Sequence, residues 1–197
     1  MEYNYRNLVF EGGGVKGIAY GGALNKIQEL NILPGIKRVA GTSAGAITAS
    51  LLAVGYSPDE IAEIISRTNF HKFEDNTFFI IRDVIRIIRK FGWNKGQVFV
   101  NWIGELIRMK TGTDTTTFED LKNAGCKDLY IVCTNVSKQT AEVLSYETTP
   151  HLTIKEAVRM SMGIPIFFAA IRNEQNEIIV DGAVTWNYPI NIFDNIK

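Results

Sequence analysis

Short apolar runs alternate with helical segments in the first part of the chain. Residues 8–10 form an apolar run, a glycine-rich stretch follows, and a helix is predicted over 18–30. A second apolar run, 36–40, comes after a turn at Pro34-Gly35. This order of strand, loop, helix and strand predicts a βαβ unit, which has parallel strands and a covering helix. We therefore expect an α/β fold with a parallel sheet.

Local start signals predict two further helices. Ser57 and Pro58 begin a helix that runs to about Thr68. Thr153 and Glu156 form a capping box for a helix that ends near Met162. Periodicity and apolar runs predict the remaining elements, which are helices over 97–109 and 117–125 and strands over 128–136, 141–146 and 177–180. The first two of these strands are expected to form a hairpin.

Residues 76–91 combine a strongly apolar composition with a row of cations. Arg82, Arg86, Arg89 and Lys90 recur at spacings that place them on one side of a helix. Two interpretations stay open. The segment is either a core-packing helix with a solvated basic face, or a lid or interfacial helix that lies on an anionic lipid surface.

Composition limits the class of protein without adding a function. A length of 197 residues suits one domain spanning 1–197, and a formal net charge of zero argues against a general affinity for nucleic acid. The chain has no apolar run long enough to span a bilayer and no signal-peptide layout at its amino terminus, so we expect a cytoplasmic or peripheral membrane protein. Cys126 and Cys133 fit no ligand or disulfide pattern and are expected to be reduced, buried or half-buried thiols.

The pentapeptide Gly41-Thr42-Ser43-Ala44-Gly45 stands between the second predicted strand and an alanine-rich helical segment, 46–53. This pattern predicts a nucleophile elbow, in which a serine occupies a sharp turn from strand to helix. Gly41 and Gly45 permit the close backbone approach that such a turn requires. Ser43 would then lie near a helix amino terminus, where free N–H groups favour developing negative charge. On this motif alone, an ordinary tight turn is the alternative.

The first glycine-rich loop resembles a nucleotide-binding motif but lacks its partners. Gly12, Gly14 and Gly17 match Gly-x-Gly-x-x-Gly, which needs an acidic residue near the end of the second strand to bind a ribose. After Glu29, the next acidic residue is Asp59, and no Gly-Lys-Ser/Thr sequence closes the loop as in a P-loop. The sequence therefore argues against a nucleotide site.

Three consecutive glycines, Gly12, Gly13 and Gly14, favour an oxyanion hole instead. Backbone N–H groups that no side chain obstructs can converge on a developing negative oxygen. Lys16 either adds positive charge near this loop or is a solvated loop lysine.

The last predicted strand ends in Asp181-Gly182-Ala183. Open α/β sheets build their active sites at the carboxyl ends of strands, so Asp181 is the natural acidic partner for Ser43. A turn aspartate that holds backbone N–H groups is the alternative.

Neither histidine suits a catalytic triad of the α/β-hydrolase type, because that triad places its histidine after the acid in the sequence. His71 is expected on the surface, and His151 is expected to have a local structural role before the 153–162 helix. We therefore predict a Ser43–Asp181 dyad, in which the carboxylate accepts the serine proton and later activates water. Such a carboxylate needs a partly desolvated site to become a better base.

Three motifs in this order, residues 11–17, 41–45 and 181–183, resemble the patatin-like phospholipase family, and 159–165 resembles the family's helix before the last strand. The resemblance extends from about Leu8 to Pro189, with Glu11 where many relatives have aspartate. It implies a three-layer α/β/α fold with a mainly parallel central sheet.

The resemblance also implies the chemistry. Ser43 is the nucleophile, Asp181 is the base, and Gly13 with Gly14 are the preferred oxyanion donors in the 12–14 loop. No metal or other cofactor takes part. The resemblance also assigns supporting positions in the three motifs, around the catalytic residues and the oxyanion loop. These are Lys16, Gly17, Gly41, Gly45, Gly182 and Ala183. Relatives usually continue with further helices, so a chain ending at Lys197 is either a minimal member or one that lacks carboxyl-terminal helices.

The predicted function is hydrolysis of phospholipid or lysophospholipid, of the phospholipase A or lysophospholipase type, by way of an acyl-enzyme. Peripheral membrane contact would involve 76–91, no nucleic-acid partner is expected, and an activating protein partner stays open. The alternatives are an acyltransferase, a soluble carboxylesterase and a catalytically silent membrane-binding module.

Overall fold

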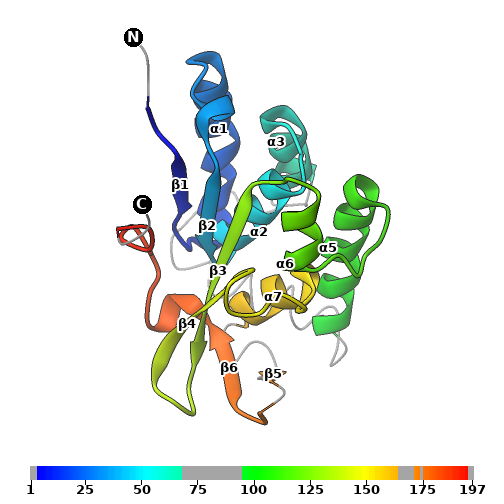
Figure 1. The fold of residues 1–197 in the computed structure, drawn as a ribbon, viewed down its shortest axis with the longest axis vertical. Coiled ribbons are helices and arrows are strands. Elements are labelled where there is room, and N and C mark those ends of the chain that lie inside the picture. Colours follow the sequence, from blue (N-terminus) through cyan, green and yellow to red (C-terminus); the bar gives the residue numbers. More distant parts are fainter. Residues whose placement is uncertain (1–3, 68–94, 164–170, 174, 195–197) are drawn as a thin grey trace, which may run out of the picture.

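The structure is a computed structural model of the chain, and it describes residues 4–67, 95–163, 171–173 and 175–194 (Figure 1). The basic segment 76–91 and His71 lie outside the described residues. Among the described helices, none is long and apolar enough to cross a membrane.

The described strands form one six-stranded sheet, in which successive pairings join β1, β2, β3, β6 and β5, and β4 also pairs with β3. The strands are β1 (Asn7–Phe10), β2 (Arg38–Thr42), β3 (Asp128–Asn135), β4 (Thr140–Leu144), β5 (Ile171–Arg172) and β6 (Ile178–Asp181). The pair β1–β2 is parallel, as the βαβ pattern predicts, and the pair β2–β3 is parallel as well. The hairpin β3–β4 and the pairs β3–β6 and β5–β6 are antiparallel, so the sheet is mixed.

The helices follow the predicted order. They are α1 (Ala19–Glu29), α2 (Ala44–Ala53), α3 (Pro58–Arg67), α5 (Lys95–Thr111), α6 (Phe118–Asn123) and α7 (Ile154–Ser161). Short 3₁₀ turns occupy η1 (Gly14–Ile18), η2 (Leu33–Gly35) and η4 (Gly182–Val184). The predicted caps are confirmed, because the Ser57 and Thr153 hydroxyls accept from the N–H groups of Glu60 and Glu156. The predicted helix over 18–30 begins as η1 and continues as α1.

Strand alternation divides the core between the two faces of the sheet. Val39, Leu129 and Ile131 point to the face on which α2 and α7 pack, together with the apolar sides of the other described helices. On the opposite face, Ala40 and Tyr130 pack against Phe193, whose ring lies 5.0 Å from that of Tyr130. The described residues thus supply the sheet and one helical layer, and the segment 185–194 covers part of the other face (Figure 1).

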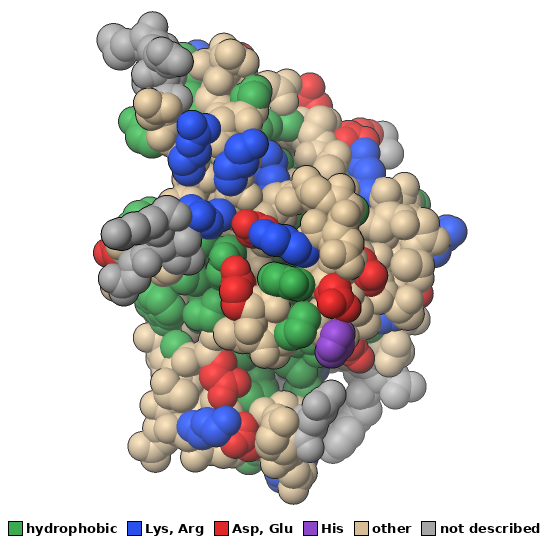
Figure 2. Space-filling view, in the orientation of Figure 1, with side chains coloured by type: hydrophobic (Ala, Val, Ile, Leu, Met, Phe, Trp, Pro, Cys, Tyr) green, Lys and Arg blue, Asp and Glu red, His purple; other side chains and the backbone are tan. Residues whose placement is uncertain are grey.

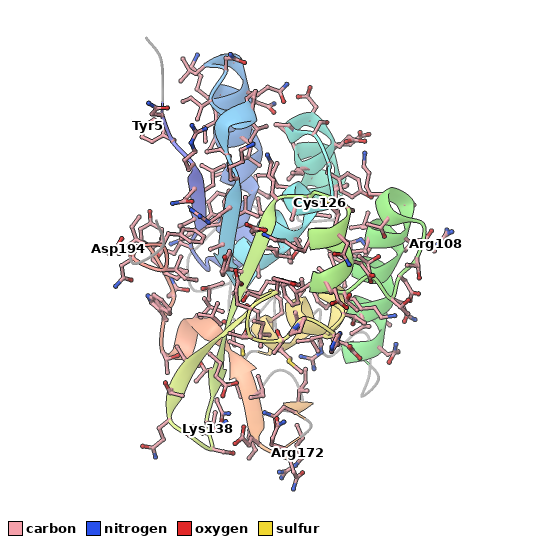
Figure 3. All side chains as sticks on the ribbon, in the orientation of Figure 1. Tyr5, Arg108, Cys126, Lys138, Arg172 and Asp194 are labelled. Atoms are coloured by element: carbon pink, nitrogen blue, oxygen red, sulfur yellow. The ribbon has the colours of Figure 1, made fainter. Side chains whose placement is uncertain are left out.

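The two cysteines are free thiols, as predicted. Cys133 is buried within β3, and burial raises its pKa to about 12. Cys126 is half-buried and lies shortly before β3 (Figure 3).

Lys and Arg side chains lie interspersed with Asp and Glu side chains on the face shown in Figure 2, and the formal net charge is zero.

Two strands meet end to end beside β3, and this junction positions the candidate site. The last registered pair of β2 and β3 is Thr42 with Val132, and Asp181 of β6 pairs with the next residue, Cys133. The β3 residues that pair with β4, 131–135, overlap those that pair with β2 and those that pair with β6. One edge of β3 can pair with only one strand at a given residue, so β4 lies on one edge of β3, and β2 and β6 share the other. Parallel β2 and antiparallel β6 therefore approach each other with their carboxyl ends.

Candidate active site

Ser43 lies at the turn from β2 into α2, as the pentapeptide predicts. Its backbone has φ 54° and ψ −123°, in the left-handed half of conformational space. Such a conformation costs a non-glycine residue about 1–3 kcal/mol and is typical of functional sites that the surrounding structure holds in place. Its hydroxyl donates a hydrogen bond to Asp181 Oδ2 at 2.8 Å.

The glycines around Ser43 are needed because main-chain segments cross within contact distance. A Cβ atom on Gly41 would lie 2.2 Å from the Gly45 carbonyl oxygen, and one on Gly45 would lie 2.3 Å from the Phe10 carbonyl oxygen. A Cβ atom on Gly182 would lie 2.4 Å from the Val132 carbonyl oxygen. A Cβ atom on Gly17 would be less crowded, because its nearest neighbour is the Ala44 Cβ atom at 3.3 Å. The elbow, the glycine loop and the turn after Asp181 are thus packed directly on one another.

Asp181 is 3% exposed and uses its two oxygens differently. Oδ2 accepts from Ser43, and Oδ1 accepts from the Ala183 N–H at 2.8 Å. The sequence left open whether this aspartate serves a turn or the serine, and the structure shows both contacts. Burial raises the Asp181 pKa above its ordinary value, although the hydrogen bonds from Ala183 and Ser43 oppose this shift. The carboxylate is therefore a stronger base than one in water.

The segment after Asp181 is bound to the glycine loop. The Gly12 N–H donates to the Asn187 carbonyl at 3.0 Å, and Asn187 Nδ2 donates to the Gly12 carbonyl and to Glu11 Oε1, each at 3.0 Å. The N–H groups of Gly13 and Gly14 have no acceptor among the described residues, and Gly14 has a φ of 53° with open space beside it. Asn187 has no sequence signal, because an asparagine in a loop follows no periodic pattern.

Two residues at the end of α7 also reach Ser43, and the sequence did not indicate either role. Ser161 Oγ accepts from the Ser43 N–H at 2.9 Å and donates to the Val132 carbonyl at 2.6 Å. Met162 Sδ lies 3.6 Å from Ser43 Oγ. Both belong to the 159–165 stretch, whose resemblance to a family helix was the one available indication.

The other candidates form no hydrogen bond with the dyad within the described residues. Lys16 is exposed on η1. The His151 side chain is 82% exposed and its Nδ1 lies 3.3 Å from Glu119 Oε2, a local contact at the surface, so the expected structural role before the 153–162 helix stays a prediction. Within the described part of the chain, no histidine contacts Ser43 or Asp181.

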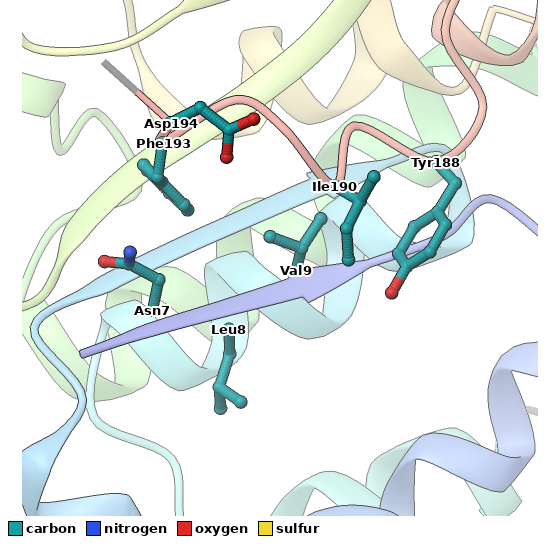
Figure 4. Close-up of a pocket in the computed structure, with 7 residues that line it drawn as sticks. All are labelled: Asn7, Leu8, Val9, Tyr188, Ile190, Phe193 and Asp194. Carbon is teal, nitrogen blue, oxygen red and sulfur yellow. The ribbon is translucent and has the colours of Figure 1, made fainter. Parts of the chain in front are cut away.

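A cavity of about 360 Å³ lies elsewhere, between β1 and the carboxyl-terminal segment (Figure 4). It is lined by Asn7, Leu8, Val9, Tyr188, Ile190, Phe193 and Asp194. The lining includes neither Ser43 nor Asp181, so this cavity is separate from the candidate active site.

A buried serine–aspartate pair at a strand-to-helix elbow, beside a glycine loop, is the arrangement of a serine hydrolase. The chain belongs to the patatin-like phospholipase family, whose family model matches residues 8–194.

Known proteins resemble the chain in sequence and in fold. It is 35% identical over 195 residues to the uncharacterized protein R571 of Acanthamoeba polyphaga mimivirus, a match that covers 98% of this chain and 63% of that protein. It is 31% identical to the probable lipid hydrolase 463L of Invertebrate iridescent virus 6, covering 95% of this chain and 63% of the relative. Among solved structures, VipD from Legionella pneumophila has a TM-score of 0.69 at 22% identity, covering 95% of this chain and 47% of VipD. The likeness to VipD shows the fold, and the chain spans less than two thirds of each of these proteins.

Proposed function

We propose that the chain is a lipid acyl hydrolase that cleaves the carboxylic ester of a phospholipid or lysophospholipid through an acyl-enzyme. The observation that carries the proposal is the 2.8 Å hydrogen bond from Ser43 Oγ to the buried Asp181 carboxylate, in a chain that belongs to a lipid-hydrolase family. The relative 463L is named a probable lipid hydrolase, which supports a lipid ester as the substrate.

In the acylation step, Ser43 Oγ attacks the ester carbonyl carbon while its proton moves to Asp181 Oδ2. The carbonyl oxygen becomes an oxyanion, for which we propose the N–H groups of Gly13 and Gly14 as donors. Each such donor lowers the barrier by about 3–4 kcal/mol in serine hydrolases. The Gly12 N–H already donates to Asn187, so it is not among these donors. Collapse of the intermediate breaks the bond to the alcohol, which leaves with the proton from Asp181.

In the deacylation step, water gives a proton to Asp181 as its oxygen attacks the acyl carbonyl. Collapse releases the fatty acid and returns the proton to Ser43 Oγ. Both steps use the carboxylate as a base, and its raised pKa favours proton transfer from the serine and from water. A Ser–Asp pair therefore needs no histidine, provided that the carboxyl group stays buried.

Membrane contact belongs to the same proposal. The basic, apolar segment 76–91 is proposed to bring the protein to anionic lipid, and an activating protein partner is compatible with this chemistry.

The test measures fatty-acid release from mixed anionic phospholipid vesicles, from lysophospholipid and from a soluble short-chain ester. We expect release by the wild type and a loss of at least about 10³-fold in Ser43→Ala and in Asp181→Asn. Wild-type release by Ser43→Ala would refute the serine mechanism. Transfer of the acyl group to an added alcohol would favour an acyltransferase. Vesicle binding without release by the wild type or either variant would favour a silent binding module.

A further inference from the structure

The main-chain hydrogen-bond ladder is interrupted where β2 and β6 meet. Thr42 is the last residue of β2 in register with β3, and the chain turns into α2 at Ser43. The Ser43 N–H does not donate to β3 directly. Instead it donates to Ser161 Oγ, and the same hydroxyl donates its proton to the Val132 carbonyl of β3. One side chain of α7 thus satisfies two backbone groups at the junction.

The direction of these two bonds is determined by the hydroxyl itself. Ser161 is fully buried, and its single proton is used in the 2.6 Å bond to Val132. The oxygen lone pairs therefore remain for the Ser43 N–H at 2.9 Å. Two buried polar groups would lose their partner together if this hydroxyl were removed.

The acid is held by the same segment. The Asp181 N–H donates to the Gly163 carbonyl at 2.9 Å, two residues after Ser161. Ser161 and the residues just after α7 therefore bind the main chain of both dyad residues, although Ser43 follows β2 and Asp181 ends β6. Ser43 keeps a strained backbone conformation, which persists only where neighbouring groups restrain it.

We propose that Ser161 is a positioning residue of the active site: its hydroxyl bridges Val132 and Ser43 at the strand junction and holds the nucleophile in line with Asp181. The inference rests on the proposed serine chemistry, but it does not depend on which ester is the substrate. Ser161 does not touch the substrate or the reacting atoms in this proposal. It acts through the main chain of Ser43.

The chain contains a matched control. Ser50 of α2 is also fully buried, yet its hydroxyl has no hydrogen-bond partner within the described ranges. Ser50→Ala therefore removes a buried hydroxyl without disturbing the junction, whereas Ser161→Ala removes one that bridges it. A difference between the two variants reports the bridge and not burial alone.

The experiment measures the rate at which a fluorophosphonate probe labels Ser43, together with kcat and KM on a short-chain ester, below the melting temperature of every variant. We expect Ser161→Ala to lower the labelling rate and kcat by about 10- to 100-fold with KM within about 2-fold of the wild type, because the nucleophile is misplaced and not removed. Ser50→Ala should stay within about 2-fold in all three quantities.

A structural role alone would lower the melting temperature of Ser161→Ala and leave kcat of the folded protein unchanged, and that result would overturn the proposal. If Ser161→Ala does not fold, Ser161→Cys replaces it, since a thiol keeps the shape and weakens both hydrogen bonds. An unchanged kcat in that variant would equally overturn the proposal. Labelling of wild-type Ser43 without fatty-acid release would reject the lipid substrate but leave the Ser161 test intact, whereas absence of labelling would reject both.

Discussion

Gly45→Ala tests the close packing of the elbow on the glycine loop. Gly45 lies in the first turn of α2, and an added Cβ atom would meet the Phe10 carbonyl oxygen at 2.3 Å and the Glu11 carbonyl oxygen at 2.7 Å. Gly22 of α1 is the matched control, because it is also helical and a Cβ atom there would have nothing within 4 Å. Both substitutions replace a helical glycine by alanine, so their difference isolates the steric contact.

The magnitude follows from these distances. Alanine is favoured over glycine in a helix by about 1 kcal/mol, and Gly22→Ala should gain about that much stability. Overpacking a well-packed site costs about 1–3 kcal/mol, and the contacts of Gly45 are main-chain atoms that cannot rotate away, which favours the upper value. Gly45→Ala should then lose about 2 kcal/mol net. At about 2–4 °C per kcal/mol for a chain of this size, Tm should fall by about 4–8 °C, while Gly22→Ala raises it by about 2–4 °C.

Thermal unfolding followed by circular dichroism measures both variants under identical conditions. Activity on a short-chain ester should fall about 100-fold in Gly45→Ala, since moving the elbow by about 1 Å misplaces the nucleophile. A Gly45→Ala protein that melts at or above the wild-type temperature would refute the close approach of α2 to the glycine loop.

The remaining predictions concern the dyad, the glycine loop and one distant carboxylate. Asp181→Asn should lose activity yet melt at or above the wild-type temperature at neutral pH, because burial raises the Asp181 pKa and its ionisation disfavours the folded state as the pH rises above 3.8; a clearly lower Tm would contradict this reasoning. For the same reason, the acidic limb of the wild-type pH–rate profile should lie above 3.8, and a limb at or below that pH would show that the buried carboxyl is not the base. Asn187→Ala removes the side-chain hydrogen bonds to Gly12 and Glu11 and should lower kcat about 10-fold, because these bonds position the glycine loop. The control Asn191→Ala, at an exposed position, should leave kcat unchanged, and equal kcat values in the two variants would argue against a positioning role for Asn187. Glu177 has its pKa lowered from 4.5 to about 2, chiefly by the hydrogen bond from Lys138, which lies at the tip of the β3–β4 hairpin (Figure 3), so it contributes stability above 4.5 that is lost as the pH falls toward 2. Denaturant unfolding across that range should show a smaller loss in Glu177→Gln than in the wild type, and identical losses would contradict the assignment.

Local signals were sufficient for most elements of the fold. The caps at Ser57 and Thr153 mark helix starts because a side chain within one turn satisfies the free N–H groups, and the structure confirms helices from Pro58 and Ile154. Short apolar runs predicted β1, β2 and β3, and the order of strand, helix and strand predicted that β1 and β2 are parallel. These features depend on neighbours in the sequence, which is why the sequence alone could predict them.

The catalytic motifs were visible in the sequence, and a Ser43–Asp181 dyad was predicted from them, but the strand arrangement that brings the two residues together was not. Ser43 and Asp181 are separated by 138 residues, and their contact depends on β6 running antiparallel to β3 and ending opposite Cys133. The sequence predicted that Asp181 ends a strand, without showing that this strand would meet β2 end to end.

What the sequence determined by itself is a set of local conformations and residue types: a serine at a tight turn, glycines that permit close approach, and a carboxylate after a buried strand. The tertiary structure alone decided how these parts are restrained. Ser161 and Asn187 bind main-chain groups of distant segments, and such bonds leave no periodic pattern or spacing in the chain. The raised pKa of Asp181 likewise comes from burial beneath elements that are remote in sequence, because desolvation depends on what surrounds a group in space.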